Sequence, residues 1–285
     1  MEPMVTTSEG ARQTGATKAS RSVLAWWRGC AKTAAISATS VGGDGPLFLL
    51  DYLLRLLRVA VFLGLWRVIL AGRGPVEGMD LGALLTYTLI AEALAEPLAC
   101  RTRFEDALWN GSIAMRFLRP LPLVGELLAE ACGRWLFNLA FFSLPLLLVA
   151  TLLGLSPWPA RAGAGALFPL SLALAIAVGL AIDLLFGIAM VSFDLNRWAL
   201  DQVRGTVTVL LTGAVVPLVL YPWGIGRMLD WLPFAAMASA PLRIYIGVGD
   251  PWRLLALQAA WSLMLWPIVG VCWRKSRQKL ASYGG

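Results

Sequence analysis

The feature that most constrains the fold is a series of six long apolar stretches separated by charged or Gly/Pro-rich segments. A helix needs about 20 mostly apolar residues to cross the hydrocarbon core of a bilayer, and each stretch is close to this length. Only 14% of the chain is charged, whereas soluble domains carry about 25%. The sequence therefore predicts an all-α integral membrane protein. The six expected transmembrane helices cover about residues 50–71, 81–100, 134–155, 166–192, 204–221 and 253–273.

The distribution of basic residues predicts the orientation of these spans. An even number of spans places both termini on one side, and that side receives 18 of the 24 Lys and Arg residues. Cytosolic loops carry the excess of Lys and Arg in membrane proteins. We therefore expect both termini and the segment 101–133 in the cytosol. The cysteines lie on the same side and are expected to be free thiols. They are Cys30, Cys100, Cys132 and Cys272.

The N-terminal region precedes the first apolar stretch. Residues 1–20 are rich in Ser, Thr and Gly and lack the apolar segment of a signal peptide, so we expect them to be disordered. Residues 21–46 predict an amphipathic helix followed by a turn, with basic residues on one face and Trp26 and Trp27 on the other. This pattern is typical of a helix that lies on an anionic leaflet. A solvated tail is the alternative.

The segment 101–122 is dense in charges of both signs, yet its apolar residues recur at near-helical spacing. Each charge would cost about 2.5–3.5 kcal/mol in hydrocarbon. Gly111 interrupts the helical pattern and Pro120 ends it. We predict two short amphipathic helices at the membrane surface, hinged at Gly111. An ordinary charged loop between spans is the alternative.

Charged residues inside predicted spans are informative because they are expensive to bury. Arg55, Arg58, Glu92 and Glu96 lie near the cytosolic ends of the first two spans, where pairing or snorkelling is favoured over a role in a pathway. Asp183 lies deeper, in the fourth span.

Asp183 belongs to a ladder of mostly small residues at intervals of four, which consists of Ser171, Ala175, Gly179, Asp183 and Gly187. Small residues at this spacing let two backbones approach closely, so this face is predicted to be a helix-packing seam. The Asp then either accepts a hydrogen bond from a neighbouring helix or lines a polar part of a pathway.

Residues 222–252 contain four prolines and are too apolar for an exposed loop, yet too interrupted for a span. Irregular backbone at membrane depth must be buried in protein. We therefore predict a re-entrant or interfacial hairpin on the outer face, and Trp223 and Trp231 suit the membrane interface.

Several function classes are excluded by composition. The chain has no histidine, which removes Ser-His catalysis and imidazole metal sites. No Lys follows a Gly, so the chain cannot contain the phosphate-binding loop of P-loop ATPases. Any ATP hydrolysis must take place on another chain. The net charge of +7 is explained by membrane topology, and no nucleic-acid partner is expected.

The charged segment resembles the first cytosolic loop of ABC type-2 exporter permeases, through Glu105, the Gly111 six residues later and the ending Leu118-Arg119-Pro120. The C-terminal half resembles one six-span subgroup of the same family. The matching residues are Thr212-Gly213, Pro217, Tyr221-Pro222, Leu232-Pro233-Phe234, Pro241, Gly247, Gln258, Trp261 and Tyr283-Gly284-Gly285.

This resemblance implies a six-span permease domain over residues 47–285 whose cytosolic loop is a coupling helix that docks on a separate ATP-binding subunit. The implied docking residues are Glu105, Gly111, Arg116, Arg119 and Pro120. The implied pathway or packing residues are Gly179, Asp183, Gly187, Gly213 and Pro217. ATP and Mg²⁺ would bind the partner subunit, so the chain is expected to have no catalytic residue, metal or cofactor of its own.

The resemblance further implies a bacterial inner-membrane location, contact with membrane lipids, and pairing with a second permease that is either the same chain or a related one. An apolar seam suits a hydrophobic or amphipathic substrate, such as a drug, a natural product or a lipid, better than an ion. Two alternatives come from other classes. A lipid-modifying membrane enzyme would need clustered carboxylates or a nucleophile near the interface, and only Glu92 and Glu96 come close. A non-transporting scaffold would not need a coupling loop.

Overall fold

The computed structural model describes residues 26–40, 46–70, 78–118 and 122–282. These ranges form helices and connecting turns and contain no β-strand, which confirms the all-α prediction. The predictions for residues 1–20, Arg119 and Pro120 lie outside the described residues.

The helices follow one another along the chain with short connections. A first helix covers residues 26–40. The others are α2 (Pro46–Ile69), α3 (Leu81–Ala93), α4 (Ala95–Ala99), α5 (Phe104–Trp109), α6 (Ile113–Phe117), α7 (Leu123–Asn138), the π-helical turn η2 (Leu139–Ser143), α8 (Leu144–Leu152), α9 (Ala162–Ser192), α10 (Arg197–Leu211), the 3-10 turns η3 (Leu218–Leu220) and η4 (Pro222–Gly224), α11 (Ile225–Leu229), α12 (Pro233–Met237), α13 (Ser239–Tyr245) and α14 (Pro251–Ser282).

Three helices in the described part of the chain are long and apolar enough to cross a membrane. They are the continuous α7–η2–α8 unit (Leu123–Leu152), α9 (Ala162–Ser192) and the segment Pro251–Ser276 of α14. α3 is a shorter apolar helix. The chain therefore has the helices of a multi-pass membrane protein. The count of six spans and their orientation stay predictions.

The expected second and third spans differ in form from the observed helices. The second is divided at Leu94, because Pro97 in α4 cannot donate the backbone hydrogen bond that would continue α3. The third begins at Leu123 rather than near residue 134, because the polar helical turns of α7 join the apolar α8 without a break.

The expected fifth span differs most. α10 ends at Leu211 instead of continuing to residue 221. Gly213 has a φ of +74°, which lies outside the right-handed helical region, and Pro217 restricts the residue before it to extended conformations. The chain then continues in the short turns η3 and η4.

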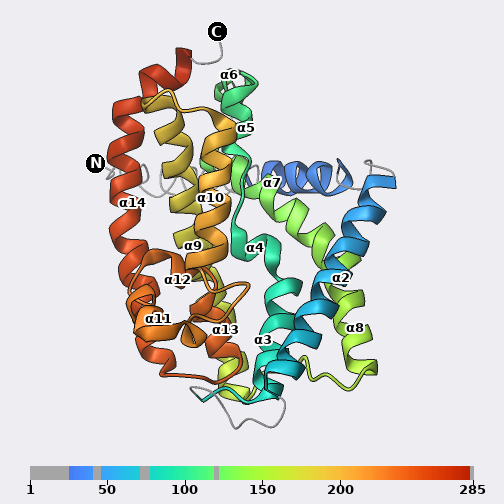
Figure 1. Ribbon diagram of the computed structural model, residues 1–285. Coiled ribbons are helices and arrows are strands. Elements are labelled where there is room, and N and C mark those ends of the chain that lie inside the picture. Colours follow the sequence, from blue (N-terminus) through green and yellow to red (C-terminus); the bar gives the residue numbers. More distant parts are fainter. Residues whose placement is uncertain (1–25, 41–45, 71–77, 119–121, 283–285) are drawn as a thin grey trace, which may run out of the picture.

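α9 is the central helix of the molecule. It packs along α14 and also contacts α4, α5, α10, α12 and α13. Figure 1 shows α5 and α6 at the end of the molecule where α14 finishes, and α11 and α13 toward the opposite end. The helix over residues 26–40 runs crosswise to the long helices (Figure 1).

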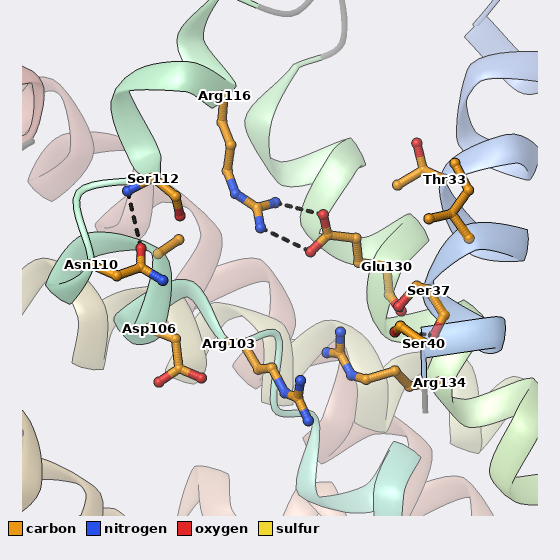
Figure 2. Close-up of a pocket in the computed structure, with 12 residues that line it drawn as sticks. Thr33, Ser37, Ser40, Arg103, Asp106, Asn110, Ser112, Arg116, Glu130 and Arg134 are labelled. Carbon is orange, nitrogen blue, oxygen red and sulfur yellow. Dashed lines mark hydrogen bonds and ion pairs between the residues drawn. The ribbon is translucent and has the colours of Figure 1, made fainter. Parts of the chain in front are cut away.

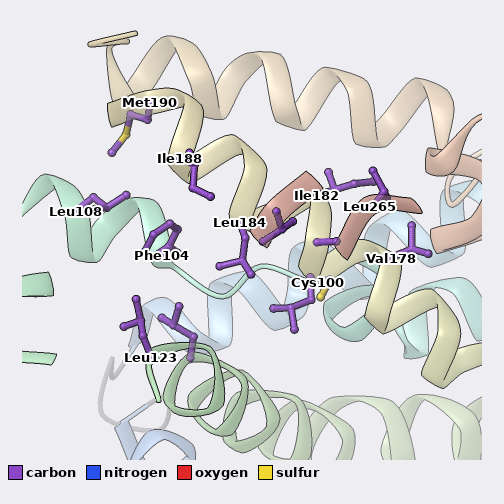
Figure 3. Packing of buried hydrophobic residues seen from close by; sticks show 14 of the residues in the cluster. Cys100, Phe104, Leu108, Leu123, Val178, Ile182, Leu184, Ile188, Met190 and Leu265 are labelled. Carbon is purple, nitrogen blue, oxygen red and sulfur yellow. The ribbon is translucent and has the colours of Figure 1, made fainter. Parts of the chain in front are cut away.

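The main core cluster includes side chains from the segment that was expected to be cytosolic. Phe104, Leu108 and Ile113 are fully buried and belong to the same cluster as Leu184 and Ile188 of α9. Figure 3 shows Phe104 and Leu108 beside these α9 residues. α5 and α6 are therefore seated on the helical core and do not form a detached loop.

The crosswise helix is held against α7. A Cβ at Gly133 of α7 would collide with the backbone carbonyl of Ala34, so the two backbones touch there. Ser37 also donates a hydrogen bond to the Glu130 carbonyl at 2.9 Å. Trp27 and Ile36 are exposed, as an interfacial helix requires. The described helix reaches residue 40, and the predicted start at residue 21 lies outside the described residues.

Two ion pairs join α2 to the second predicted span. Arg55 lies 3.1 Å from Glu96 and Arg58 lies 2.5 Å from Glu92. The pairing favoured from the sequence for these four charges is confirmed.

The region predicted as an outer hairpin consists of the short helices α11, α12 and α13. α12 and α13 pack on both α9 and α14. Gln258 of α14 donates to the Ala236 carbonyl at 2.8 Å and accepts from Ser171 of α9 at 2.8 Å. This network fixes the hairpin region to the two long helices.

Candidate functional site

The segment between α4 and α7 forms two short helices, α5 and α6, on either side of Gly111. Gly111 has a φ of +73°, a conformation that a residue with a Cβ adopts only at a cost. The Asn110 side chain accepts a hydrogen bond from the backbone N–H of Ser112 at 3.0 Å and closes the turn. The two predicted short helices on either side of Gly111 are therefore present, and their location at the membrane surface stays a prediction.

The connection from α4 into α5 has an unusual backbone. Cys100 and Arg103 are both in the left-handed region, with φ values of +46° and +61°. Such conformations are uncommon in residues other than glycine and cluster at functional sites. Thr102 is buried between them, whereas Arg101 and Arg103 are exposed. The chain thus presents alternate side chains to the interior and to the surface.

A buried ion cluster joins this connection to two long helices. Arg204 of α10 donates to both carboxylate oxygens of Glu105, at 3.0 and 3.2 Å, and forms an ion pair with Asp183 of α9. The same guanidinium donates to the Cys100 carbonyl at 3.3 Å. Thr102 donates to Asp183 through its hydroxyl and through its backbone N–H.

The cluster is almost completely removed from solvent. The exposed fractions of the side chains are 5% for Arg204, 1% for Asp183 and 12% for Glu105. Burial raises the pKa of the Glu105 carboxyl, and the charge of Arg204 opposes that rise. Buried charges of this kind are tolerated only when paired and hydrogen-bonded, because each isolated ion would pay a large desolvation penalty. Arg204 therefore holds two carboxylates from different elements.

The small-residue ladder of α9 packs against the same connection between α4 and α5. A Cβ at Gly179 would lie 2.6 Å from the Cβ of Cys100, and one at Gly187 would overlap the ring of Phe104. All five ladder residues are buried. The close approach at Gly179 and Gly187 thus seats the chain from Cys100 to Phe104 on α9, with Asp183 between the two glycines.

Replacing Gly187 with leucine should therefore destabilise the protein. The added side chain has no space beside Phe104, and overpacking of this kind typically costs about 1–3 kcal/mol. Gly163→Leu, in the first turn of the same helix, is the matched control because nothing lies within 4 Å of its Cβ position. Melting temperatures of the two purified variants measure the difference, and equal values would contradict the packing described for Gly187.

The other predicted site residues lie in three places. Arg116 of α6 pairs with Glu126 of α7 at 3.3 Å. It also pairs with Glu130 of α7 at 2.9 Å (Figure 2). Gly213 follows the C-terminal end of α10, where its carbonyl accepts a hydrogen bond from the Tyr87 hydroxyl at 2.6 Å. Pro217 precedes η3. The structure brings Glu105, Gly179, Asp183 and Gly187 together, and does not bring Gly213 or Pro217 to them.

Arg204 and Thr102 are the members of the cluster that sequence reasoning did not single out. Arg204 is the only charged residue in the predicted fifth span, just as Asp183 is the only one in the fourth. A single basic residue in one span and a single acid in its neighbour is a signal for pairing within the membrane domain. Thr102 carries no comparable signal.

Three apolar side chains of the α5–α6 segment are exposed on the protein surface. Trp109, Met115 and Leu118 have exposed fractions of 58%, 67% and 82%. Exposed apolar side chains that gather in one patch mark a contact with another protein or with a membrane, whereas single ones are normal. We call these three residues the apolar tip.

Long apolar helices packed around α9, together with a charged element fixed to them by a buried ion cluster, define a multi-pass membrane protein. A sequence profile described as "ABC-2 family transporter protein" matches residues 56–284. The chain belongs to this family and is a transmembrane permease of an ABC transporter. Membership in this family implies that the permease acts together with a separate ATP-binding subunit. A search of curated proteins found no match to the chain.

Proposed function

We propose that the chain is the permease subunit of an ABC exporter, that it forms the substrate pathway, and that it docks an ATP-binding subunit through α5 and α6. The observation that carries this proposal is the buried cluster in which Arg204 holds Glu105 of α5 and Asp183 of α9. Copurification of an ATP-binding subunit with the intact permease, and its loss when the apolar tip is altered, is the test.

The cluster supplies a physical link between docking and the membrane helices. A force on α5 acts on Glu105, and through Arg204 on α10 and Asp183 on α9. Separating these charges inside the protein would leave them uncompensated, so moving the three helices together is the lower-energy response. Packed side chains and ion pairs on rigid helices are the elements through which coupling between distant sites is carried.

The roles of the docking residues follow from where their side chains lie. Glu105 and Arg116 are engaged within the chain, so in this proposal they position α5 and α6. The apolar tip makes the contact with the ATP-binding subunit, because Trp and Met are enriched in the cores of protein interfaces. Gly111 sets the angle between the two helices. Arg119 and Pro120, which follow α6 in the sequence, stay proposed docking residues.

The complete transporter in this proposal contains two permeases, either two copies of this chain or this chain with a related one, and two ATP-binding subunits that bind ATP and Mg²⁺. It resides in a bacterial inner membrane. The substrate is proposed to be hydrophobic or amphipathic, such as a drug, a natural product or a lipid. The apolar surfaces of α9 and α14 support this class over ions.

The proposed orientation places the apolar tip in the cytosol and the outer hairpin on the other side. In a chain with its four cysteines replaced by alanine, Trp223→Cys should react with a membrane-impermeant maleimide on intact cells. Leu118→Cys should react only after the membrane is opened. Both side chains are strongly exposed on the protein surface. A cysteine that does not react on intact cells is therefore protected by the membrane and not by burial within the protein. Reaction of Leu118→Cys on intact cells would overturn the orientation.

A further inference from the structure

A polar cavity of about 500 Å³ lies between the crosswise helix, the α5–α6 element and α7. Its wall includes Ser37 of the crosswise helix, Arg103 and Asp106 near the start of α5, and Glu130 and Arg134 of α7. Figure 2 shows the guanidinium groups of Arg103 and Arg134 directed into the same part of this cavity.

The acids of the cavity wall are occupied by other arginines. Asp106 pairs with Arg197 of α10. Glu130 accepts two hydrogen bonds from Arg116, at 2.9 and 3.1 Å. Neither carboxylate therefore forms an ion pair with Arg103 or Arg134, the two remaining arginines of the wall.

Arg103 and Arg134 form no ion pair with any residue in the described ranges. Arg134 donates one hydrogen bond, to the Arg101 carbonyl at 2.9 Å, and its remaining donors face the cavity. Arg103 has no hydrogen-bond partner for its side chain within the same ranges. Two cations that share a cavity repel each other, and an anion between them would replace that repulsion with attraction. The planar guanidinium is suited to phosphate, which it binds with two parallel hydrogen bonds.

The position of the cavity narrows the choice of anion. One wall is the crosswise helix, which exposes Trp27 and Ile36 and runs beside α7, near the start of α2 (Figure 1). A Trp-bearing helix in this orientation lies at the level of lipid headgroups. We propose that Arg103 and Arg134 bind the phosphate of a phosphate-bearing anion, supplied by the headgroup of an anionic membrane lipid or by free phosphate.

The cavity borders the α5–α6 element but is not lined by the apolar tip, and its occupancy has a consequence of its own. Arg103 is the residue that precedes α5, whereas the crosswise helix is fixed on α7 through Ser37 and Gly133. A bound phosphate would therefore connect the start of α5 to the wall formed by α7 and the crosswise helix. Occupancy of the site stabilises the folded permease, because a ligand that binds only the folded state raises its stability.

The test is a thermal titration of the purified full-length permease in mixed micelles. Phosphatidylglycerol replaces phosphatidylcholine at constant total lipid, and a parallel series adds inorganic phosphate in phosphatidylcholine alone. The wild-type melting temperature should rise to a plateau in one of the two series. Arg103→Gln should need about tenfold more of the same anion to reach its midpoint, the change expected for the loss of one charge-assisted contact. Arg161→Gln, an exposed arginine at the start of α9, is the control and should keep the wild-type midpoint.

A plateau with phosphatidylglycerol identifies the lipid headgroup as the occupant, and a plateau with inorganic phosphate alone identifies free phosphate. Arg103 has no partner in the described part of the chain, so its substitution should leave the fold intact, and Arg134→Gln provides a second variant. Wild-type midpoints in both variants, or no plateau in either series, would overturn the proposal.

Discussion

Replacing Arg204 with methionine will lower the melting temperature of the purified permease by on the order of 10 °C. Methionine keeps most of the volume and removes the charge, so Asp183 and Glu105 are left buried without their cation. Breaking a buried ion pair by removing one partner costs about 3–5 kcal/mol, and a protein of this size loses about 2–4 °C per kcal/mol. Thermal unfolding in detergent, followed by intrinsic fluorescence, measures the loss.

Arg197→Met is the matched control because Arg197 pairs with Asp106 through side chains that are 46% and 39% exposed. Such surface pairs contribute about 0–1 kcal/mol. Combining Arg204→Met with Asp183→Asn and Glu105→Gln should restore part of the stability, because no uncompensated charge then remains. If Arg204→Met and Arg197→Met unfold at the same temperature, the cluster does not hold α5 to α9 and α10.

The fold could be predicted best for the helices that consist of one long apolar run. α9 and α14 lie close to the predicted fourth and sixth spans because no glycine turn or charged segment interrupts them. The ends of other helices depend on information that hydropathy lacks. α7 extends a helix beyond its apolar part, and the left-handed Gly213 stops α10 inside an apolar run. Whether such broken helices cross the bilayer depends on packing that no single segment encodes.

The candidate site could be predicted only in part, because its contacts are tertiary. The spacing of Gly179, Asp183 and Gly187 shows a close-packed face, but not that residues 100–104 occupy it. The charges of Glu105 and Arg116 suggested external docking, and only the structure shows partners for them within the chain. A charged side chain near a helix surface can satisfy either an internal or an external partner, and its sequence position does not distinguish them.

The apolar residues of the docking segment illustrate the same limit. Phe104, Leu108 and Ile113 are buried in the core, whereas the apolar tip is exposed. Leu108 and Trp109 are neighbours in α5, yet one is buried and the other exposed, and apolar spacing alone does not say which residue faces the core. The sequence predicted the hinge but could not assign each residue to the core or to a partner.

Met115→Glu combined with Leu118→Glu should weaken binding of the ATP-binding subunit by at least about a hundredfold. Two carboxylates in the core of an apolar interface must be desolvated without a partner, and central interface residues each contribute about 2 kcal/mol or more. The side chains are 67% and 82% exposed, so the substitutions should leave the fold of the permease unchanged. Met228→Glu is the matched control, because Met228 is 74% exposed and belongs to α11, which lies toward the opposite end of the molecule (Figure 1).

The decisive measurement is the amount of coexpressed ATP-binding subunit that copurifies with the tagged permease, recorded beside the melting temperature of each permease. We expect the wild type and Met228→Glu to retain the subunit, and the Met115→Glu/Leu118→Glu variant to lose it while unfolding at the wild-type temperature. Full retention of the subunit by that variant, with ATPase activity still stimulated by substrate, would show that α5 and α6 are not the docking element.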